Sequence, residues 1–261
     1  MTVLISHDNN NVTTITLNRP EKRNAINIEM ILALKKSLQK VKDDSSVRCV
    51  VITGSGNSFS AGGDISEMSD RFGKALVSNI RLDTGLNEIV RLIRSIKRPV
   101  IAAINGPCYG AGFVIATACD LLYASSESKF GFAYGNIGLI PEASYFITRL
   151  VGLIKAKELV FFRKTLSPNE ALSYGLINRI IDSNIFNSEI NNLSTELSKG
   201  PVDTLGLSKD LLNAAFENQL LTHLKVEGLS QGTAFTSDEH KEGVQAFLEK
   251  RKPDFTDLQA K

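Results

Sequence analysis

Two glycine-containing stretches hold the residues of this chain whose types and spacing could do chemistry. The first, SFSAGGDI at residues 58–65, places Ala61, Gly62 and Gly63 before Asp64 at a predicted strand-to-helix turn. Small residues let backbone N–H groups approach a ligand oxygen closely. The alternative interpretation is a tight turn in which Asp64 caps a helix.

The second stretch, GPCYGAGFVIA at residues 106–116, turns into a predicted apolar helix. The first N–H groups of a helix have no partner within the helix and lie at its positive end. One N–H group from each turn could bind the same carbonyl oxygen and form an oxyanion hole. Either motif alone gives many false matches, whereas their order and flanking residues make the pair specific.

Other groups that could do chemistry are scattered. Glu142 follows Pro141 in GNIGLIPEAS, residues 135–144, where a proline and an acid would also suit an ordinary helix start. The three histidines form no catalytic or metal-binding arrangement, and each is predicted to lie in solvent. They are His7, His223 and His240. No Ser-His-Asp arrangement and no metal-type spacing is present in the sequence, so we expect no metal.

Alternating strands and helices must position these residues. Short β-branched or apolar runs predict strands at 12–18, 49–55, 100–105, 120–125, 130–133 and 176–181. Helical spacing of apolar residues predicts helices at 30–41, 86–99 and 111–119. The runs at 49–55 and 100–105 are apolar on both faces, which predicts strands covered on two sides. The alternation favours an α/β core.

The sequence changes character from about Pro141, where helical patterns dominate. We expect a long helical segment at 184–198 and two more helices before Lys252. The predicted boundary lies near residue 200, which gives a core domain at 1–200 and a C-terminal helical region at 201–261.

Composition indicates a soluble cytoplasmic protein. The chain has 261 residues, 43% of them hydrophobic, which fits one large domain with a helical appendage. The net charge of +2 gives no sign of nucleic-acid binding. Three cysteines in apolar runs favour a reducing compartment. No apolar run approaches ~18 residues, so no membrane association is expected.

Seven stretches, in order along nearly the whole chain, resemble the crotonase family, the enoyl-CoA hydratase/isomerase superfamily. They are NRPEKRNAIN (18–27), SFSAGGDI (58–65), RPVIAAINGPCYGAG (98–112), CDLLYAS (119–125), FGFAYGNIGLIPEAS (130–144), SPNEALSYGLINRI (167–180) and FLEKRKPDF (247–255). The resemblance implies a spiral of ββα units with a C-terminal helical trimerisation region. It also implies a homotrimer or hexamer, fatty acid metabolism and an acyl-CoA substrate with no separate cofactor.

The resemblance also assigns roles to individual residues. The oxyanion hole falls on the N–H groups of Gly63 and Ala111. Positions expected to contact CoA are Lys22, Arg23, Ala25, Ala61, Gly62, Asp64, Ile65 and Tyr134, with Phe247 and Lys250 near the CoA of a neighbouring subunit. For the basic residues, the alternative is an ordinary solvated surface.

The carboxylate pattern separates the reactions of this family. Its hydratases use two glutamates, and the matching positions here read Val114 and Tyr134. Valine cannot titrate and tyrosine is a poor base, with a reference pKa of about 10. Glu142 matches the single catalytic carboxylate of Δ3,Δ2-enoyl-CoA isomerases and related ring-enoyl-CoA isomerases. The resemblance therefore implies that Glu142 removes a proton from C2 and returns it to C4.

Two further features bear on this assignment. Apolar neighbours are expected to raise the pKa of Glu142. They are Phe113, Val114, Ile137, Leu139 and Ile140. The stretch EASYFITRLVG is about two residues shorter than is usual in the family. The alternatives are a ring-enoyl-CoA isomerase that uses Tyr134 as a second polar group, a hydratase-like crotonase, and a catalytically silent acyl-CoA-binding protein.

Overall fold

A mixed sheet forms the centre of the molecule in the computed structural model, which describes residues 1–69, 72–256 and 258. Within this part of the chain, six strands pair in the order β1-β2-β3-β4-β6-β9. They are β1 (Val3–His7), β2 (Val12–Leu17), β3 (Cys49–Gly54), β4 (Val100–Ile104), β6 (Leu121–Ser125) and β9 (Arg179–Ile181). β1 is antiparallel to β2, and each later neighbour is parallel. The predicted α/β spiral is confirmed.

A smaller sheet lies beside the first. Its strands in the described residues are β5 (Cys108–Tyr109), β7 (Phe130–Gly131) and β8 (Thr165–Leu166), in that order. β5 leads directly into α4 (Gly110–Ala118), so this sheet fixes the start of the helix that follows the second glycine stretch. The bridge between Ser60 and Cys108 joins the first glycine stretch to the same sheet.

Helices cover both faces of the large sheet, as the apolar strands at 49–55 and 100–105 predict. Ile52 and Ala102 belong to a core that also includes residues of α1, α3 and α4. The alternate residues Val51 and Ile101 face α8 in a second cluster. Because successive side chains of a strand point to opposite faces, both faces of these strands must be apolar.

The helices of the core are α1 (Ile28–Asp43), α2 (Ala75–Leu82), α3 (Glu88–Ser95), α4, α5 (Ser144–Val151), α6 (Leu153–Phe161), α7 (Pro168–Ser173) and α8 (Phe186–Ser198). Several of them begin with a recognisable capping residue. Asn27 caps α1 by accepting a hydrogen bond from Met30 N at 2.9 Å. Ser167 and Glu170 form a capping box at the start of α7.

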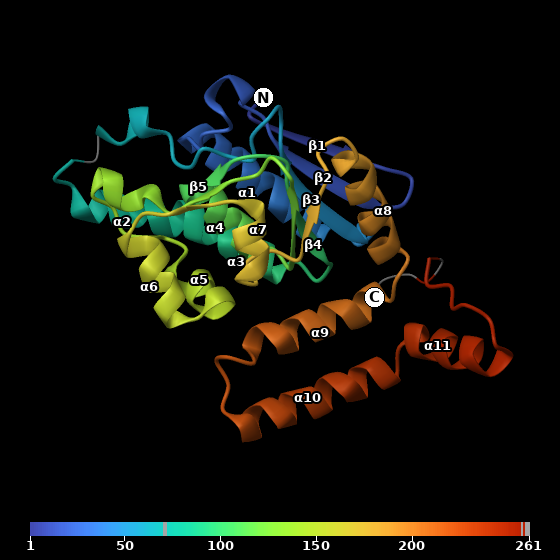
Figure 1. The fold of residues 1–261 in the computed structure, drawn as a ribbon. Helices are drawn as coiled ribbons and strands as arrows, with labels where there is room; N and C mark the ends of the chain where they lie inside the picture. The colour runs from blue at the N-terminus through green and yellow to red at the C-terminus, as the bar shows by residue number, and fades with distance from the viewer. Residues whose placement is uncertain (70–71, 257, 259–261) are drawn as a thin grey trace.

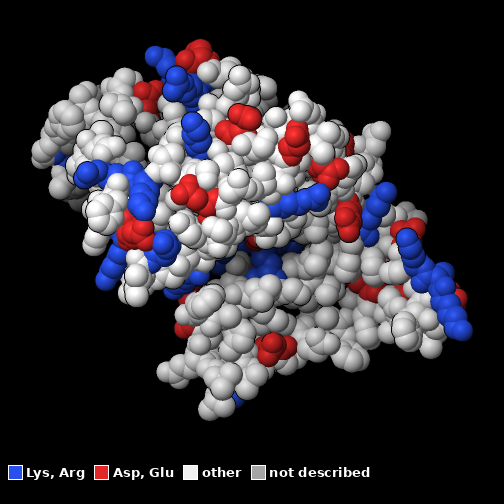
Figure 2. Space-filling model, viewed as in Figure 1, with Lys and Arg blue, Asp and Glu red and all other residues white. Residues whose placement is uncertain are grey.

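The C-terminal helices extend from the core as an arm (Figure 1). They are α9 (Val202–Ala214), α10 (Leu220–Phe235) and α11 (Asp238–Glu249), one more within the described residues than the sequence predicts. Side chains of both signs are interspersed over the core, whereas α9 and α10 show few charged side chains in the same view (Figure 2). No described helix has the length and apolarity that crossing a membrane would require.

Several predicted boundaries differ from the structure. The strand predicted at 130–133 ends at Gly131, because the chain enters the 3-10 helix η5 (Ala133–Ile137). The helix predicted at 86–99 is a π-helical turn, η4 (Asp83–Asn87), followed by α3, which ends at Ser95. Glu142 does not begin α5, which starts two residues later with Ala143 at its N-cap.

Candidate active site

The two glycine turns touch each other. Gly62 has φ 98° and Gly110 has φ 51°, and such positive values are unfavourable for most residues that carry a side chain. A Cβ atom placed on Gly62 would lie 3.3 Å from the Cα atom of Gly110. A Cβ atom placed on Gly110 would lie 3.2 Å from the Cα atom of Gly62 and 3.9 Å from the nitrogen of Gly63. Glycine at both positions therefore lets the two turns meet.

The two predicted oxyanion donors lie at this junction. In the turn that contains Gly63, Ile26 N donates to Gly62 O at 2.7 Å and Asp64 N donates to Ile26 O at 2.9 Å. The Gly63 N–H makes no hydrogen bond of its own within the described residues. Ala111 is the second residue of α4, where a helix leaves its N–H groups without an internal acceptor. Both N–H groups can therefore donate to a bound oxygen.

The segment before α1 lies alongside the first glycine turn. Ala61 N donates to Arg23 O at 2.8 Å, which places the predicted CoA contacts Lys22, Arg23, Ala25 and Ala61 on neighbouring backbone. Lys22 and Arg23 are exposed, and Ala25 is half-buried. The structure thus brings together the residues expected near the CoA phosphates and those expected near the oxyanion hole.

Asn24 fixes this segment in place, a role the sequence analysis missed. Its side chain is fully buried, and Nδ2 donates to Ser55 O at 2.9 Å and to Ser58 O at 2.8 Å. Oδ1 of the same amide accepts from Arg19 N at 2.9 Å. The residue type could have indicated this role, because an asparagine tolerates the positive φ of 55° found here and often forms hydrogen bonds with nearby backbone.

Asp64 and Glu67, which follow the first glycine turn, are already used for structure. Asp64 caps the short helix η2 (Ile65–Glu67) and pairs with Arg19 at 3.0 Å. The Ser66 hydroxyl, which donates to this carboxylate, is the first cause that lowers the pKa of Asp64. Glu67 accepts from Ile28 N at 3.1 Å. The N-cap interpretation of Asp64 is therefore confirmed, while Ile65 is exposed beside it.

Tyr134 lies near the glycine turns and within range of the charge of Glu142. Its side chain is 8% exposed, and Cε1 of the ring lies 3.9 Å from the position of a Cβ atom on Gly110. Burial is the first cause that raises the pKa of Tyr134, and the negative charge of Glu142 is the second. Glu142 itself is half-buried in the turn before α5. The carboxylate and the phenol therefore lie on the side of the molecule where the glycine turns meet.

The surroundings expected for Glu142 are only partly present. Val114 and Phe113 are buried in the core, as predicted. Ile137, Leu139 and Ile140 are 50%, 47% and 78% exposed. The prediction that these three residues enclose Glu142 in apolar surroundings is therefore wrong for this chain. The reason is that the segment from η5 to α5 runs over the surface.

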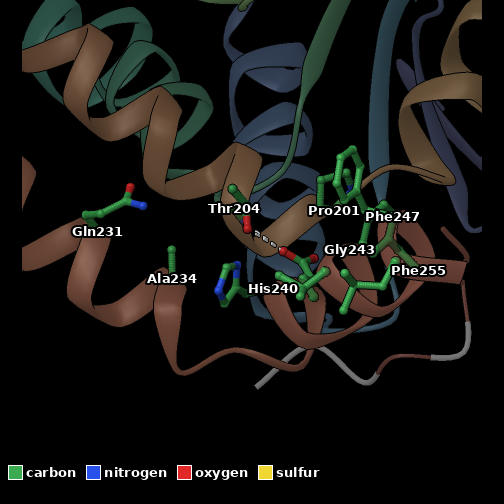
Figure 3. Close-up of a pocket in the computed structure, with 11 residues that line it drawn as sticks. Pro201, Thr204, Gln231, Ala234, His240, Gly243, Phe247 and Phe255 are labelled. Carbon is green, nitrogen blue, oxygen red and sulfur yellow. Dashed lines mark hydrogen bonds between the residues drawn. The ribbon is translucent and has the colours of Figure 1, made fainter. Parts of the chain in front are cut away.

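Phe247 and Lys250 lie elsewhere. Both belong to the region of α11, which is far from α4 in Figure 1. Phe247 instead lines a mainly apolar cavity of about 410 Å³ between the C-terminal helices. Figure 3 shows this cavity, with the Thr204 hydroxyl donating to Glu239 at 2.7 Å beside it. This chain alone does not bring these two residues to the glycine turns.

Comparison with known proteins shows which family the chain resembles. The family model for enoyl-CoA hydratase/isomerase matches residues 7–259. The chain is 35% identical over 259 residues to the 1,2-epoxyphenylacetyl-CoA isomerase of Escherichia coli strain K12, covering 98% of this chain and 99% of the relative. It is 33% identical over 249 residues to the short-chain-enoyl-CoA hydratase of Clostridium acetobutylicum, covering 92% of each. The crystal structure of an enoyl-CoA hydratase from Mycobacterium smegmatis matches with a TM-score of 0.92 at 29% identity, covering 98% of this chain and 99% of the other.

Proposed function

The chain belongs to the enoyl-CoA hydratase/isomerase family, and within it we propose that the protein is an enoyl-CoA isomerase with a single catalytic carboxylate. The reaction moves a double bond from C3 to C2 of an acyl-CoA thioester. Relatives of similar identity include both an isomerase and a hydratase, so the proposal depends on the residues of the site.

Substrate activation falls to the two glycine turns. The thioester carbonyl lies between the N–H groups of Gly63 and Ala111, which donate to its oxygen. When the C2–H bond breaks, negative charge moves onto this oxygen, and donors already aimed at it stabilise that charge without rearranging. Close contact of Gly62 with Gly110 holds the two donors in one place.

Proton transfer falls to Glu142. Its carboxylate accepts the C2 proton of a 3-enoyl-CoA and gives a dienolate in which O, C1, C2, C3 and C4 are conjugated. The protonated carboxyl then returns the proton to C4, which leaves the double bond between C2 and C3 and restores the carboxylate. No water, metal or redox partner enters this reaction.

Hydration requires groups that this site does not offer at the corresponding positions. A hydratase must activate a water molecule and protonate carbon at separate points. Val114 is an apolar core residue, and Tyr134 keeps its proton because burial raises its pKa. Asp64 and Glu67 are engaged by Arg19, Ser66 and the backbone of Ile28.

One observation carries the proposal: the ring of Tyr134 lies 3.9 Å from where a Cβ atom of Gly110 would be, at the glycine junction, and the charge of Glu142 acts on the same phenol. This relation supports a position for Glu142 beside the carbon atoms next to a bound thioester. A second candidate is isomerisation of a CoA ester derived from an aromatic ring. The 35% identity to the 1,2-epoxyphenylacetyl-CoA isomerase of Escherichia coli favours it.

A substrate comparison tests the proposal. Wild-type protein is incubated with trans-3-hexenoyl-CoA and, separately, with crotonyl-CoA, and the products are identified by chromatography and mass. We expect conversion of the first to the 2-enoyl isomer, with no change in mass, and little addition of water to the second. Rapid hydration of crotonyl-CoA would contradict the proposal, and tight CoA binding without any turnover would favour a silent acyl-CoA-binding protein.

A further inference from the structure

The hydroxyl group of Tyr134 is buried without a hydrogen-bond partner among the described residues. The residue is 8% exposed, so more than nine-tenths of it is shielded from solvent. Most buried polar groups in proteins are hydrogen-bonded, because desolvation without a partner is unfavourable. An isolated buried hydroxyl next to a predicted binding site therefore calls for an acceptor that arrives with the ligand.

The position of the ring identifies which part of a ligand would meet it. Cε1 of Tyr134 lies 3.9 Å from the Cβ position of Gly110, and the nitrogen of Gly63 lies at the same distance from that position. The thioester oxygen already receives two donors, from Gly63 and Ala111, in the proposed function. Because that oxygen is already paired in the proposed function, a donor on this ring is left for a group further along the acyl chain.

We propose that the Tyr134 hydroxyl donates a hydrogen bond to an oxygen atom on the acyl group, close to the thioester, and so selects oxygen-bearing acyl-CoA substrates over plain hydrocarbon ones. This inference rests on the acyl-CoA position in the proposed function and names the substrate class. The raised pKa of the phenol keeps the donor protonated through the neutral range. A site built around such a donor discriminates strongly against ligands that leave it unpaired.

Isosteric ligands give a test that involves no catalysis. Methoxyacetyl-CoA carries oxygen where butyryl-CoA has its third carbon, and 3-methoxypropionyl-CoA carries oxygen where pentanoyl-CoA has its fourth. None of the four has a double bond to move. Dissociation constants are measured by calorimetry for the wild type, for Tyr134→Phe, and for Tyr123→Phe, which removes the hydroxyl of a half-buried tyrosine on β6 that packs against the opposite cluster of the sheet.

We expect at least one ether ligand to bind the wild type about 10-fold more tightly than its hydrocarbon isostere. Tyr134→Phe should reduce this ratio to near 1 and melt at or above the wild-type temperature, because it removes an unsatisfied group. Tyr123→Phe should keep the ratio. A wild-type ratio near 1, or an equal ratio in wild type and Tyr134→Phe, would overturn the inference.

Two further outcomes separate this inference from the proposed function. If the ether preference is present but trans-3-hexenoyl-CoA is not isomerised, the substrate-class inference stands and the isomerase proposal fails. If none of the four thioesters binds, the substrate-class inference fails, and the trans-3-hexenoyl-CoA assay alone decides the isomerase proposal. A Tyr134→Phe variant that shifts only the pH profile of isomerisation, with the ligand ratio unchanged, would mean that the hydroxyl acts on Glu142 instead, and would also overturn the inference.

Discussion

Ala111 is expected to act through its backbone N–H rather than its methyl group, and this can be tested with two substitutions. Ala111→Pro removes the N–H, and proline is tolerated in the first turn of a helix. We predict that kcat for isomerisation falls about 10²–10³-fold. Ala111→Gly keeps the donor and should retain most of the activity. Steady-state kinetics, with melting temperatures as a check on folding, decides the matter; equal losses in both variants would contradict a donor role.

Lys22 and Arg23 are exposed beside the first glycine turn, where they could attract the phosphates of CoA. Exposed charges are screened over ~10 Å at 0.1 M salt and ~3 Å at 1 M. We therefore predict that CoA affinity falls as salt rises, and that the double variant Lys22→Ala, Arg23→Ala flattens this dependence. Acyl-pantetheine, which lacks the nucleotide phosphates, is the control and should bind independently of salt. A salt-independent affinity for CoA itself would argue against the assignment.

The roles of these residues differed in how far the sequence could predict them. Gly62 and Gly110 were recognisable, because positive φ and close backbone approach demand glycine. The buried amide of Asn24 was not recognised, since its hydrogen bonds go to segments as far as residue 58. The placement of Tyr134 near both Gly110 and Glu142 likewise depends on how β7, η5 and α4 pack, which local patterns do not contain.

At the scale of elements, α9 is held to the core by a buried ion pair. Lys209 Nζ lies 2.8 Å from Asp120 Oδ2, and their side chains are 7% and 20% exposed. Lys209 also donates to Ile93 O at 3.4 Å. Gly206 allows close packing here, because a Cβ atom at that position would lie 2.4 Å from Lys97 O. The arm is therefore attached to the core through α9.

We predict that Lys209→Met lowers the free energy of unfolding by about 3 kcal/mol at pH 7, because it leaves the Asp120 carboxylate buried without its counter-charge. Burial already raises the pKa of Asp120. A raised pKa in the folded state favours the neutral form, so the loss should shrink as pH falls from neutral toward ~3.9, the ordinary value of an aspartate. Urea unfolding at several pH values measures this. A small loss that does not change with pH would contradict it.

The elements with strong local signals were predictable, and those set by long-range packing were not. β3 and β4 were apolar on both faces, and Ser167-Pro168 with Glu170 marked the start of α7. β5 and β8 have only two residues each, and their pairing comes from chain segments far apart in sequence. α5 starts later than expected because Ala143, not Pro141, precedes its first turn.

At the scale of the whole molecule, α10 leaves several large apolar residues exposed, and large exposed apolar patches mark interaction sites. Its exposed large apolar residues are Leu220, Leu221, Leu224, Val226, Leu229 and Phe235. A single chain buries none of α10's residues. A second copy of the chain could cover these residues of α10. In such an assembly, Phe247 and Lys250 would be available to a neighbouring subunit.

We predict a trimer or hexamer in solution. Light scattering should return three or six times the chain mass of 28.5 kDa. The double variant Leu221→Glu, Leu229→Glu should dissociate the assembly, because it places charges in an apolar interface. Leu32→Glu, which changes a 61% exposed leucine on α1, is the matched control and should leave the mass unchanged. A wild-type mass of 28.5 kDa at micromolar concentration would contradict the prediction.

The proposed reaction depends on Glu142 as the group that both takes and returns the proton, so the most direct measurement is the rate of trans-3-hexenoyl-CoA isomerisation by Glu142→Gln. The amide keeps the size of the side chain and cannot accept the proton. We predict a loss of several orders of magnitude in kcat, with CoA affinity and melting temperature close to wild type. If Glu142 only complements the start of α5, the substitution should instead cost ~0.3–1 kcal/mol of stability and leave turnover largely intact, and that result would contradict the single-carboxylate account.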